Sequence, residues 1–269
     1  MSVSSSDRKT VLIIGASSGI GKCCAERLAA SGWRVFGASR SAPPAEAYET
    51  LRIDIEDDDS VRDGVALILE KSGRIDAVVN SGGVSTRGSV EDVPMAEARQ
   101  IMETNLFGVL RVCQATLPAI RASKGVIVNI SSFGGSIGTQ FGGHYAASKF
   151  AVRGLTESLR RELAPLGVRV VDVSPGLFKT RMTENVVISE GTLHGAYAGD
   201  FAKFLKGKDK FMKNMSTPEP VAALIEKILT SDHPKGYYFV GPFFQRIVLV
   251  LKKILPQRAF DALIARALG

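Results

Sequence analysis

Short apolar runs alternate along the chain with longer segments in which apolar residues recur at helical spacing. The runs have the length and composition of strands that are buried on both faces, and they lie at 10–14, 34–39, 51–55, 76–80, 125–130, 168–173 and 237–240. Helical patterns separate them at 23–30, 56–72, 94–122, 145–163 and 218–229. This alternation predicts an α/β fold: a single-domain, doubly wound parallel sheet of about seven strands with helices on both faces.

No feature of the pattern indicates a division into smaller domains. Neither a low-complexity linker nor an internal repeat interrupts the alternation, so we expect one domain over residues 1–269. Residues 1–9 are polar, and we expect a flexible N-terminus there. In doubly wound sheets ligands bind outside the carboxyl ends of the strands, which directs attention to the polar residues that follow each run.

A glycine-rich turn, G-A-S-S-G-I-G, follows the first predicted strand. Glycine lets the backbone approach a pyrophosphate closely, and the helix N-terminus beyond it favours anions. The alternative is a plain tight turn, but the position directly after a buried strand favours phosphate binding. The candidate cofactor contacts in this turn are Gly15, Ser17, Ser18, Gly19, Ile20 and Gly21.

The end of the second predicted strand bears on the choice of cofactor. A carboxylate there would hydrogen-bond the adenosine ribose of NAD, but this chain has Arg40. An arginine can bind a 2′-phosphate in a charge-assisted pair, so we predict NADP (NADPH) as the preferred cofactor and keep NAD as the alternative. Arg40 as an ordinary surface arginine is the other interpretation. Asp54, Ile55 and Asn80, at the third and fourth strand ends, are further candidates on the adenosine side.

The stretch from Ser131 to Lys149 contains the candidate chemistry. Ser132 precedes a glycine-rich loop, and Tyr145 and Lys149 follow it four residues apart, which places them on one face of a helix. A tyrosine titrates near ~10, and a neighbouring ammonium stabilises its phenolate and lowers that pKa. The pair is therefore a candidate acid–base centre, although such a pair also occurs by chance on ordinary helices.

Together, these motifs resemble those of the short-chain dehydrogenase/reductase family of the classical type. They follow one another in the family's order from about residue 10 to 180, and they are G-A-S-S-G-I-G (15–21), Asp54, N-S-G-G (80–83), Asn105, S-S (131–132), Y-A-A-S-K (145–149) and P-G (175–176). The resemblance implies a Rossmann-like domain, a nicotinamide cofactor and hydride transfer at a carbonyl or alcohol carbon. The chain departs from the family at Ile14, where threonine is usual, and at Ser81 and Gly82, where Asn-Ala is usual.

By this resemblance the family's catalytic tetrad falls on Asn105, Ser132, Tyr145 and Lys149. Ser132 would polarise the substrate carbonyl, Tyr145 would deliver the proton, and Lys149 would lower the tyrosine pKa and hold the nicotinamide ribose. Asn105 would hold a water that links Lys149 to solvent; the alternative is an asparagine that bonds locally. Tyr145, Lys149, Pro175, Gly176 and Thr180 complete the expected contacts with the nicotinamide half of the cofactor.

Two later segments are expected to shape the substrate site. Residues 177–216 hold the family's substrate lid, and they are rich in aromatic residues, methionine and lysine. These aromatics either contact an apolar substrate or pack the lid helices. Residues 243–269 form an amphipathic C-terminal extension, which we interpret first as a cover over the cleft, then as a subunit contact, then as a membrane-surface anchor.

Composition narrows the possible partners and compartment. The net charge of +7 comes from scattered basic residues without interleaved aromatics, so we expect no nucleic-acid partner. Three cysteines without metal-ligand spacing predict buried thiols in a reducing compartment and no metal site. There is no apolar signal segment and no run near the ~20 residues of a membrane span. We expect a cytoplasmic protein, with peripheral membrane contact through the C-terminal segment as the further option, that forms a homodimer or homotetramer.

The sequence thus predicts an NADPH-dependent oxidoreductase that reduces a ketone or aldehyde on an apolar substrate such as a steroid, a retinoid or another lipid-like molecule. One alternative is an NAD(P)-dependent alcohol dehydrogenase that works in the oxidative direction. A second is a non-catalytic NADPH-binding regulator, against which the intact Ser132, Tyr145 and Lys149 argue.

Overall fold

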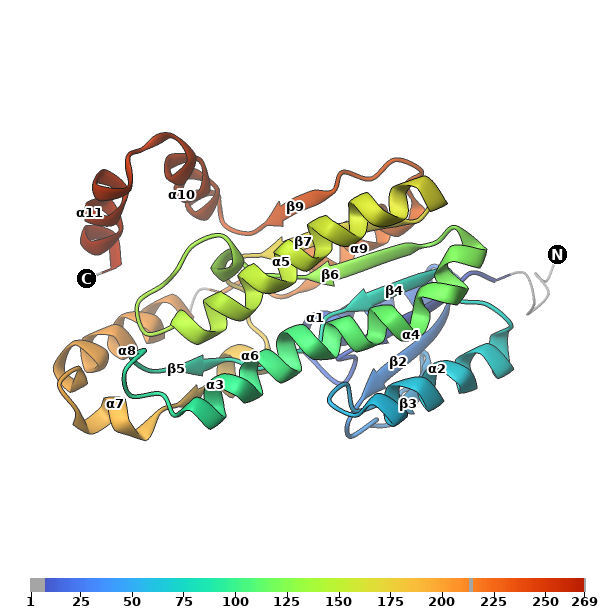
Figure 1. Ribbon diagram of the computed structural model, residues 1–269, viewed down its shortest axis with the longest axis horizontal. Helices are drawn as coiled ribbons and strands as arrows, with labels where there is room; N and C mark the ends of the chain where they lie inside the picture. Colours follow the sequence, from blue (N-terminus) through green and yellow to red (C-terminus); the bar gives the residue numbers. More distant parts are fainter. Residues whose placement is uncertain (1–7, 213–214, 269) are drawn as a thin grey trace.

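A seven-stranded parallel sheet forms the centre of the molecule, as seen in a computed structural model that describes residues 8–212 and 215–268 (Figure 1). Its strand order is β3-β2-β1-β4-β6-β7-β9. The strands are β1 (Thr10–Ile14), β2 (Arg34–Ser39), β3 (Glu49–Arg52), β4 (Ala77–Asn80), β6 (Val126–Ile130), β7 (Arg169–Pro175) and β9 (Tyr237–Val240). The predicted fold class is confirmed.

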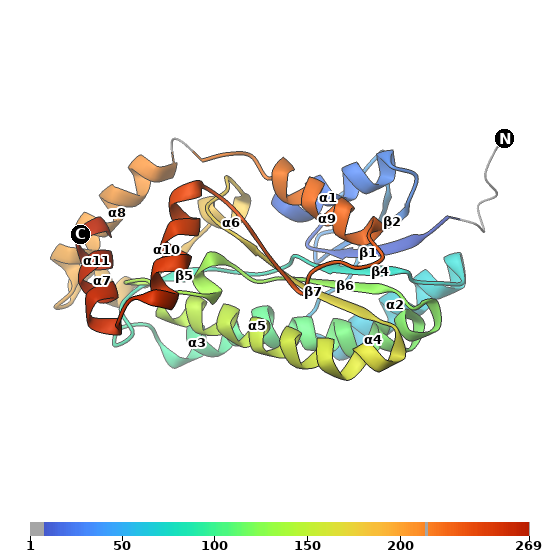
Figure 2. The same ribbon diagram turned by 90° about the horizontal axis from the view of Figure 1, so that it is seen from above.

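Helices cover both faces of this sheet (Figure 2). Alternate residues of each strand point to opposite faces, so Val11 and Ile13 join one apolar core and Leu12 and Ile14 join the other. Helices α1 (Gly19–Ala30) and α9 (Glu219–Thr230) close the first core. The second core lies under α2 (Asp58–Ser72), α4 (Gly108–Ser123) and α5 (Gly143–Leu163). Burial on both faces explains why the strands read as continuous apolar runs.

The order in which the strands are added to the sheet reverses between β1 and β4. From β1 the order proceeds outward to β2 and β3, and β4 then begins the other half on the opposite side. The loops after these strands are tied to their neighbours: Gly15 N donates to Ala38 O (2.8 Å), and Ser81 N donates to Ile14 O (3.2 Å). Such a switch point leaves a crevice at the carboxyl ends of the strands, where ligands of this fold bind.

The predicted helix over 94–122 is continuous in space but changes its winding. It comprises α3 (Met95–Met102), a π-helical turn (Glu103–Phe107) and α4. A π-helical turn bulges the backbone, and such turns are often found at functional sites. This one contains Asn105, so the change of winding falls on a candidate catalytic residue.

Several predicted boundaries shift in the structure, among them the start of the first helix, predicted at residue 23 and observed at Gly19. The strand predicted at 51–55 is β3 at Glu49–Arg52, because its pairing ends where Arg52 meets Ser39, the last residue of β2. Helix α5 begins at Gly143 instead of Tyr145, which places Tyr145 in the first turn. The predicted flexible N-terminus falls mainly on residues 1–7, which lie outside the described residues.

The segments expected to shape the substrate site gather at one end of the molecule, the left end in both views, away from α2 (Figures 1 and 2). A two-stranded sheet that the sequence pattern does not predict joins β5 (Thr86–Arg87) to β8 (Val187–Ile188). The remaining elements there are α6 (Arg181–Glu184), α7 (Glu190–His194), α8 (Ala198–Met212), α10 (Phe243–Ile254) and α11 (Gln257–Leu268). Within residues 8–212 and 215–268, no helix combines the length and apolar content needed to span a membrane.

Candidate active site

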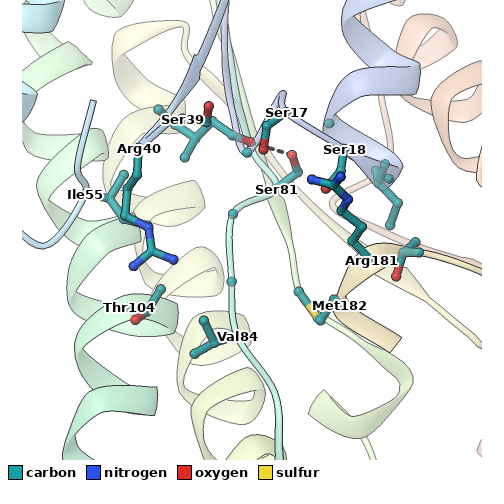
Figure 3. A pocket seen from close by; sticks show the side chains of 18 of the residues that line it. Ser17, Ser18, Ser39, Arg40, Ile55, Ser81, Val84, Thr104, Arg181 and Met182 are labelled. Atoms are coloured by element: carbon teal, nitrogen blue, oxygen red, sulfur yellow. Dashed lines mark hydrogen bonds between the residues drawn. The ribbon is translucent and has the colours of Figure 1, made fainter. Parts of the chain in front are cut away.

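A cavity of about 530 Å³ opens at the carboxyl ends of β1, β2 and β4, at the switch point of the sheet (Figure 3). Most of the cofactor candidates from the sequence line it: Gly15, Ser17, Ser18, Gly19, Ile20, Gly21, Arg40, Asp54, Ile55 and Thr180. These residues come from four separate parts of the chain. The fold therefore brings together positions that the sequence could relate only through their place after strands.

The glycine positions of this turn leave little room for side chains. Gly15 and Gly19 have positive φ angles of 80° and 54°, which glycine adopts without strain. A Cβ at Gly21 would lie 2.3 Å from Gly15 O, closer than any side chain tolerates. Helix α1 begins at Gly19, so its unpaired backbone N–H groups and positive dipole end face the cavity.

Arg40 extends into the cavity on the side of Thr104 (Figure 3). It is exposed, and none of the ion pairs found among the described residues involves it. Its guanidinium is therefore available to an anionic ligand. Asp54 also lines the cavity, while its Oδ1 accepts a hydrogen bond from Glu56 N (3.1 Å), so this carboxylate shapes the turn after β3 as well.

Five cofactor candidates do not line this cavity: Tyr145 and Lys149, which are described below, and Asn80, Pro175 and Gly176. Asn80 is buried at the end of β4, where its amide donates to Asn129 Oδ1 (2.8 Å). Pro175 ends β7, and Gly176 N donates to Val240 O (2.7 Å). Leu177 N beyond them donates to Gln245 Oε1 (3.3 Å) on α10. Asn80 thus links the ends of β4 and β6, and the residue after the Pro-Gly turn is hydrogen-bonded to α10.

Tyr145 and Lys149 lie on one face of α5, as their spacing predicts. Lys149 Nζ is 6.0 Å from the centroid of the Tyr145 ring. Ser132 begins the short 3-10 turn Phe133–Gly135 after β6, and its hydroxyl hydrogen-bonds the Tyr145 side chain. Ser131 is buried and points back to Val173 O (3.4 Å) instead. The hydroxyl, the phenol and the ammonium therefore converge, with Ser132 as the serine that takes part.

The pKa of Tyr145 reflects opposing effects. Burial raises it above the ordinary value, and the hydrogen bond with Ser132 and the positive charge of Arg87 lower it. The net direction of the Tyr145 pKa is therefore upward, whereas the sequence predicts a pKa lowered by Lys149. The charge that opposes the rise is that of Arg87, which sequence reasoning passes over. A raised pKa favours the protonated phenol, the form that a proton donor needs.

Lys149 is 3% exposed, and its Nζ donates to Ile130 O (3.1 Å) at the end of β6. Burial lowers the pKa of Lys149 to about 8, and the opposing effect of the Asp172 carboxylate raises it. Asp172 on β7 is itself 1% exposed, and burial raises its pKa. A buried lysine that titrates near neutrality can pass protons as well as hold a charge.

Asn105 is completely buried and makes three hydrogen bonds. Its Nδ2 donates to Val84 O (3.0 Å) and Ser148 Oγ (2.9 Å), and its Oδ1 accepts from Val84 N (2.8 Å). A Cβ at Gly83 would lie 2.9 Å from Asn105 Oδ1 and 3.5 Å from Lys149 Nζ. Asn105 thus fixes the loop after β4 against α5, at the edge of the cavity beside Lys149. The proposed water relay stays a prediction.

Motif reasoning missed several residues at this site. Thr104 and Arg181 line the cavity, and Arg87 lies over the Tyr145 ring; Met182 lines the cavity too, but it belongs to the predicted lid. Thr104 precedes Asn105 in the π-helical turn, and Arg181 follows Thr180, so proximity to known candidates was the available signal. Arg87 belongs to the unpredicted strand β5, and no local pattern points to it.

The residues present fit a dinucleotide. The glycine turn admits a pyrophosphate without side-chain obstruction, and the α1 N-terminus and Arg40 supply positive potential for its phosphates. Lys149 and Asn105 stand at the opposite end, beside the acid–base tyrosine. A protein that holds a dinucleotide at the switch point of its sheet next to such a tyrosine belongs to the class of NAD(P)-dependent oxidoreductases that act on CH–OH or C=O groups.

Comparison with known proteins identifies the family within this class. The family model described as short chain dehydrogenase matches residues 9–191, and the chain belongs to this family of short-chain dehydrogenases/reductases. It is 39% identical to a 3-ketodihydrosphingosine reductase of Bacteroides thetaiotaomicron, over 91% of this chain and 93% of that protein. It is 31% identical to estradiol 17-beta-dehydrogenase 2 of Mus musculus, over 87% of this chain and 68% of that protein.

Solved structures agree with this assignment. A short-chain dehydrogenase from Streptomyces avermitilis superposes with a TM-score of 0.77 at 29% identity, covering 97% of this chain and 94% of that one. The ligand-free aldohexose dehydrogenase of Thermoplasma acidophilum gives 0.73 at 30% identity, covering 87% and 92%. In the first of these structures the similarity covers nearly the whole chain.

Proposed function

We propose that the protein is an NADPH-dependent reductase of a ketone or aldehyde on an apolar, lipid-like substrate. The observation that carries this proposal is the convergence of the Ser132 hydroxyl, the Tyr145 phenol and the buried Lys149 ammonium beside a dinucleotide cavity. Each of these groups has a role in moving a proton to a carbonyl oxygen, and no other role for the set is evident from their contacts.

The chemistry follows from where these groups stand. When bound, NADPH supplies the hydride to the carbonyl carbon. The Ser132 hydroxyl donates a hydrogen bond to the carbonyl oxygen and polarises it. Tyr145 gives its proton to that oxygen as negative charge develops there, and is left as phenolate. Lys149, with a pKa of about 8, stabilises the phenolate and can return a proton to it.

Arg40 supports the preference for NADPH. Its guanidinium enters the cavity at the end of β2 and forms no ion pair with the described residues. A 2′-phosphate there would give a charge-assisted pair that NADH lacks, which is worth about 1.5–3 kcal/mol. This corresponds to roughly a tenfold to hundredfold preference.

An apolar substrate is supported by the end of the cavity nearest Lys149 and by the relatives. Val84, Met182 and Val187 line the cavity there. The Bacteroides relative is named for 3-ketodihydrosphingosine and the mouse relative for estradiol, both largely hydrocarbon molecules. The lid aromatics do not all contribute, because Phe201 is fully buried and its ring packs 4.9 Å from that of Phe141.

Helix α10 supports the interpretation of the C-terminal extension as a cover. Its inner face reaches the loop that carries Ser132, where Lys252 Nζ donates to Ser136 O (2.6 Å). Its outer face exposes Ile247, Val250 and Ile254. We propose that α10 borders the substrate cleft. A membrane or subunit contact of the outer face stays a prediction, as does the expected homodimer or homotetramer.

The test is a cofactor titration followed by a substrate screen. Purified protein is titrated with NADPH and with NADH, and tighter binding of NADH would overturn the Arg40 argument. Long-chain 3-keto lipids, keto-steroids and retinal are then supplied with NADPH while loss of its absorbance is followed. Turnover of an apolar ketone or aldehyde supports the proposal. Turnover only of the corresponding alcohols with NADP⁺ indicates the oxidative alternative, and cofactor binding without turnover of either set indicates the regulator.

A further inference from the structure

Arg87 is a cation with no counterion among the side chains that the structure describes. Its Nη1 donates to Ser85 Oγ (3.2 Å) and Thr86 O (3.0 Å), both neutral groups. Its Nε is buried and has no hydrogen-bond partner in the described residues. Among the side chains that the structure describes, which exclude those of 1–7, 208–214 and 265–269, no carboxylate lies within 4.0 Å of the guanidinium. A largely buried charge without a counterion is costly, so its presence calls for a function.

The guanidinium of Arg87 lies over the ring of Tyr145. Its Cζ is 5.6 Å from the ring centroid, a cation–π distance comparable with the 6.0 Å of Lys149 Nζ. The backbone around it is fixed, because Gly88 N donates to Phe141 O (3.0 Å) and β5 pairs with β8. A Cβ at Gly142 would lie 3.4 Å from Arg87 Nη1, so the loop before α5 presses directly on this side chain.

The charges around Tyr145 come from several elements, and they differ in how constant they are. Lys149, on α5, has a pKa of about 8 and faces the buried Asp172 of β7. Asp172 is in turn attracted by Arg153 and Arg160. The negative charge of Asp172 therefore offsets part of the positive potential that Lys149 produces at the phenol. Arg87, on β5, stays protonated throughout the working range of pH, even though burial lowers its pKa.

We propose that Arg87 is a positioning residue whose guanidinium stabilises the phenolate form of Tyr145, the form that remains after the proton has left for the substrate. The proposal rests on the proposed role of Tyr145. Two cations, Lys149 and Arg87, would then act on the Tyr145 phenol. Arg87 lies on β5, a strand outside the family motifs. Lys149 can then exchange protons while the phenol keeps a fixed positive neighbour.

A titration of the free protein tests this proposal. Formation of phenolate is followed by near-ultraviolet absorbance in the wild type and in Arg87→Met, and the curve of the matching Tyr145→Phe form is subtracted from each to isolate one of the five tyrosines. Arg87→Met should move the Tyr145 midpoint up by about one to two pH units, because a unit charge ~6 Å away acts through a partly screened medium. Arg87→Lys should keep the Tyr145 midpoint close to that of the wild type, because it keeps the positive charge.

Matched variants keep the test decisive. Arg34→Met removes another arginine that lies over an aromatic ring, 5.3 Å from the Phe36 centroid and remote from the site, and should leave the Tyr145 midpoint unchanged. Arg87→Gln serves as a second neutral variant where Arg87→Met does not fold. An unchanged midpoint in a folded neutral variant overturns the proposal; together with a raised KM it would assign Arg87 to substrate binding. The titration needs neither cofactor nor substrate, so its outcome is separate from that of the substrate screen.

Discussion

The two sides of the cleft are built differently. On one side the glycine turn, Ser132 and the loop after β4 follow strands whose backbones are hydrogen-bonded into a seven-stranded sheet. On the other side the lid is tied down by the two-residue pairing of β5 with β8 and by aromatic contacts such as Phe141 with Phe201. Groups that hold the cofactor and move the proton need fixed positions, whereas a wall that admits a bulky substrate must open.

This contrast predicts that the strand side tolerates almost no change of shape. Gly21→Ala places a Cβ 2.3 Å from Gly15 O, so the turn must move and the pyrophosphate site is lost. We expect NADPH affinity to fall at least about a hundredfold, or roughly 3 kcal/mol, by fluorescence titration. Gly154→Ala is the matched control, because a Cβ there meets nothing within 4 Å. Equal affinity in the two variants would show that the turn is not the phosphate site.

Lys149, which lies on α5 and donates to Ile130 O at the end of β6, should make the stability of the protein depend on pH. Its pKa in the folded protein is about 8, below the ordinary 10.5, so the unfolded chain binds more protons between these values. Stability should therefore rise as pH increases from 8 to 10.5, by about 3 kcal/mol. The measurement is urea unfolding of wild type against Lys149→Met, which lacks this rise. A difference between the two that does not vary with pH would contradict the buried charge.

A pair of phenylalanine substitutions compares the two sides directly. Phe201 of α8 and Phe36 of β2 are both fully buried. Phe201→Ala should lower hydrogen-exchange protection within α8 by about a hundredfold and leave β1 and β6 unchanged, because loss of a buried ring costs ~3 kcal/mol or more and the lid opens on its own. Phe36→Ala should lower protection of the sheet instead. Loss of sheet protection in Phe201→Ala would mean that the lid and the sheet unfold as one unit.

The smallest expected effect concerns the rim of the cofactor cavity. Arg40→Gln removes the cation at the end of β2, and NADPH affinity should fall about tenfold to a hundredfold, since one charge-assisted contact is lost. NADH affinity should change less than about twofold, because NADH has no 2′-phosphate for the side chain to bind. Isothermal titration with both cofactors checks this. A parallel loss for both would assign Arg40 a structural role.

The same contrast explains what could be read from the sequence. The glycine turn, Ser132, Tyr145 and Lys149 lie directly after strands or within one helix, so local spacing is enough to relate them. Arg87 reaches the site only through pairing of β5 with β8, about a hundred residues later in the chain. Asp172 reads as a polar interruption of an apolar strand, and only tertiary packing sets it near Lys149. Residues that meet through long-range packing have no local signal.

Boundaries were missed for a related reason. The end of β3 depends on where β2 stops offering partners, and the π-helical turn around Asn105 depends on contacts with the loop after β4 and with α5. Both constraints come from contacts with other elements, so the sequence of the segment alone does not predict them. Asn80 shows the converse case: its place at a strand end was predicted, but its side chain turns into the sheet toward Asn129 and not into the cavity.

The central claim is that Tyr145 donates the proton while the strand side holds the cofactor, and Tyr145→Phe tests it most directly. With a substrate found in the screen, this variant should lose turnover by about a hundredfold to ten-thousandfold, the range for loss of a general acid. Its NADPH affinity should stay within about twofold of the wild type, since the phosphate contacts are untouched. Turnover close to that of the wild type, with NADPH bound normally, would contradict the account.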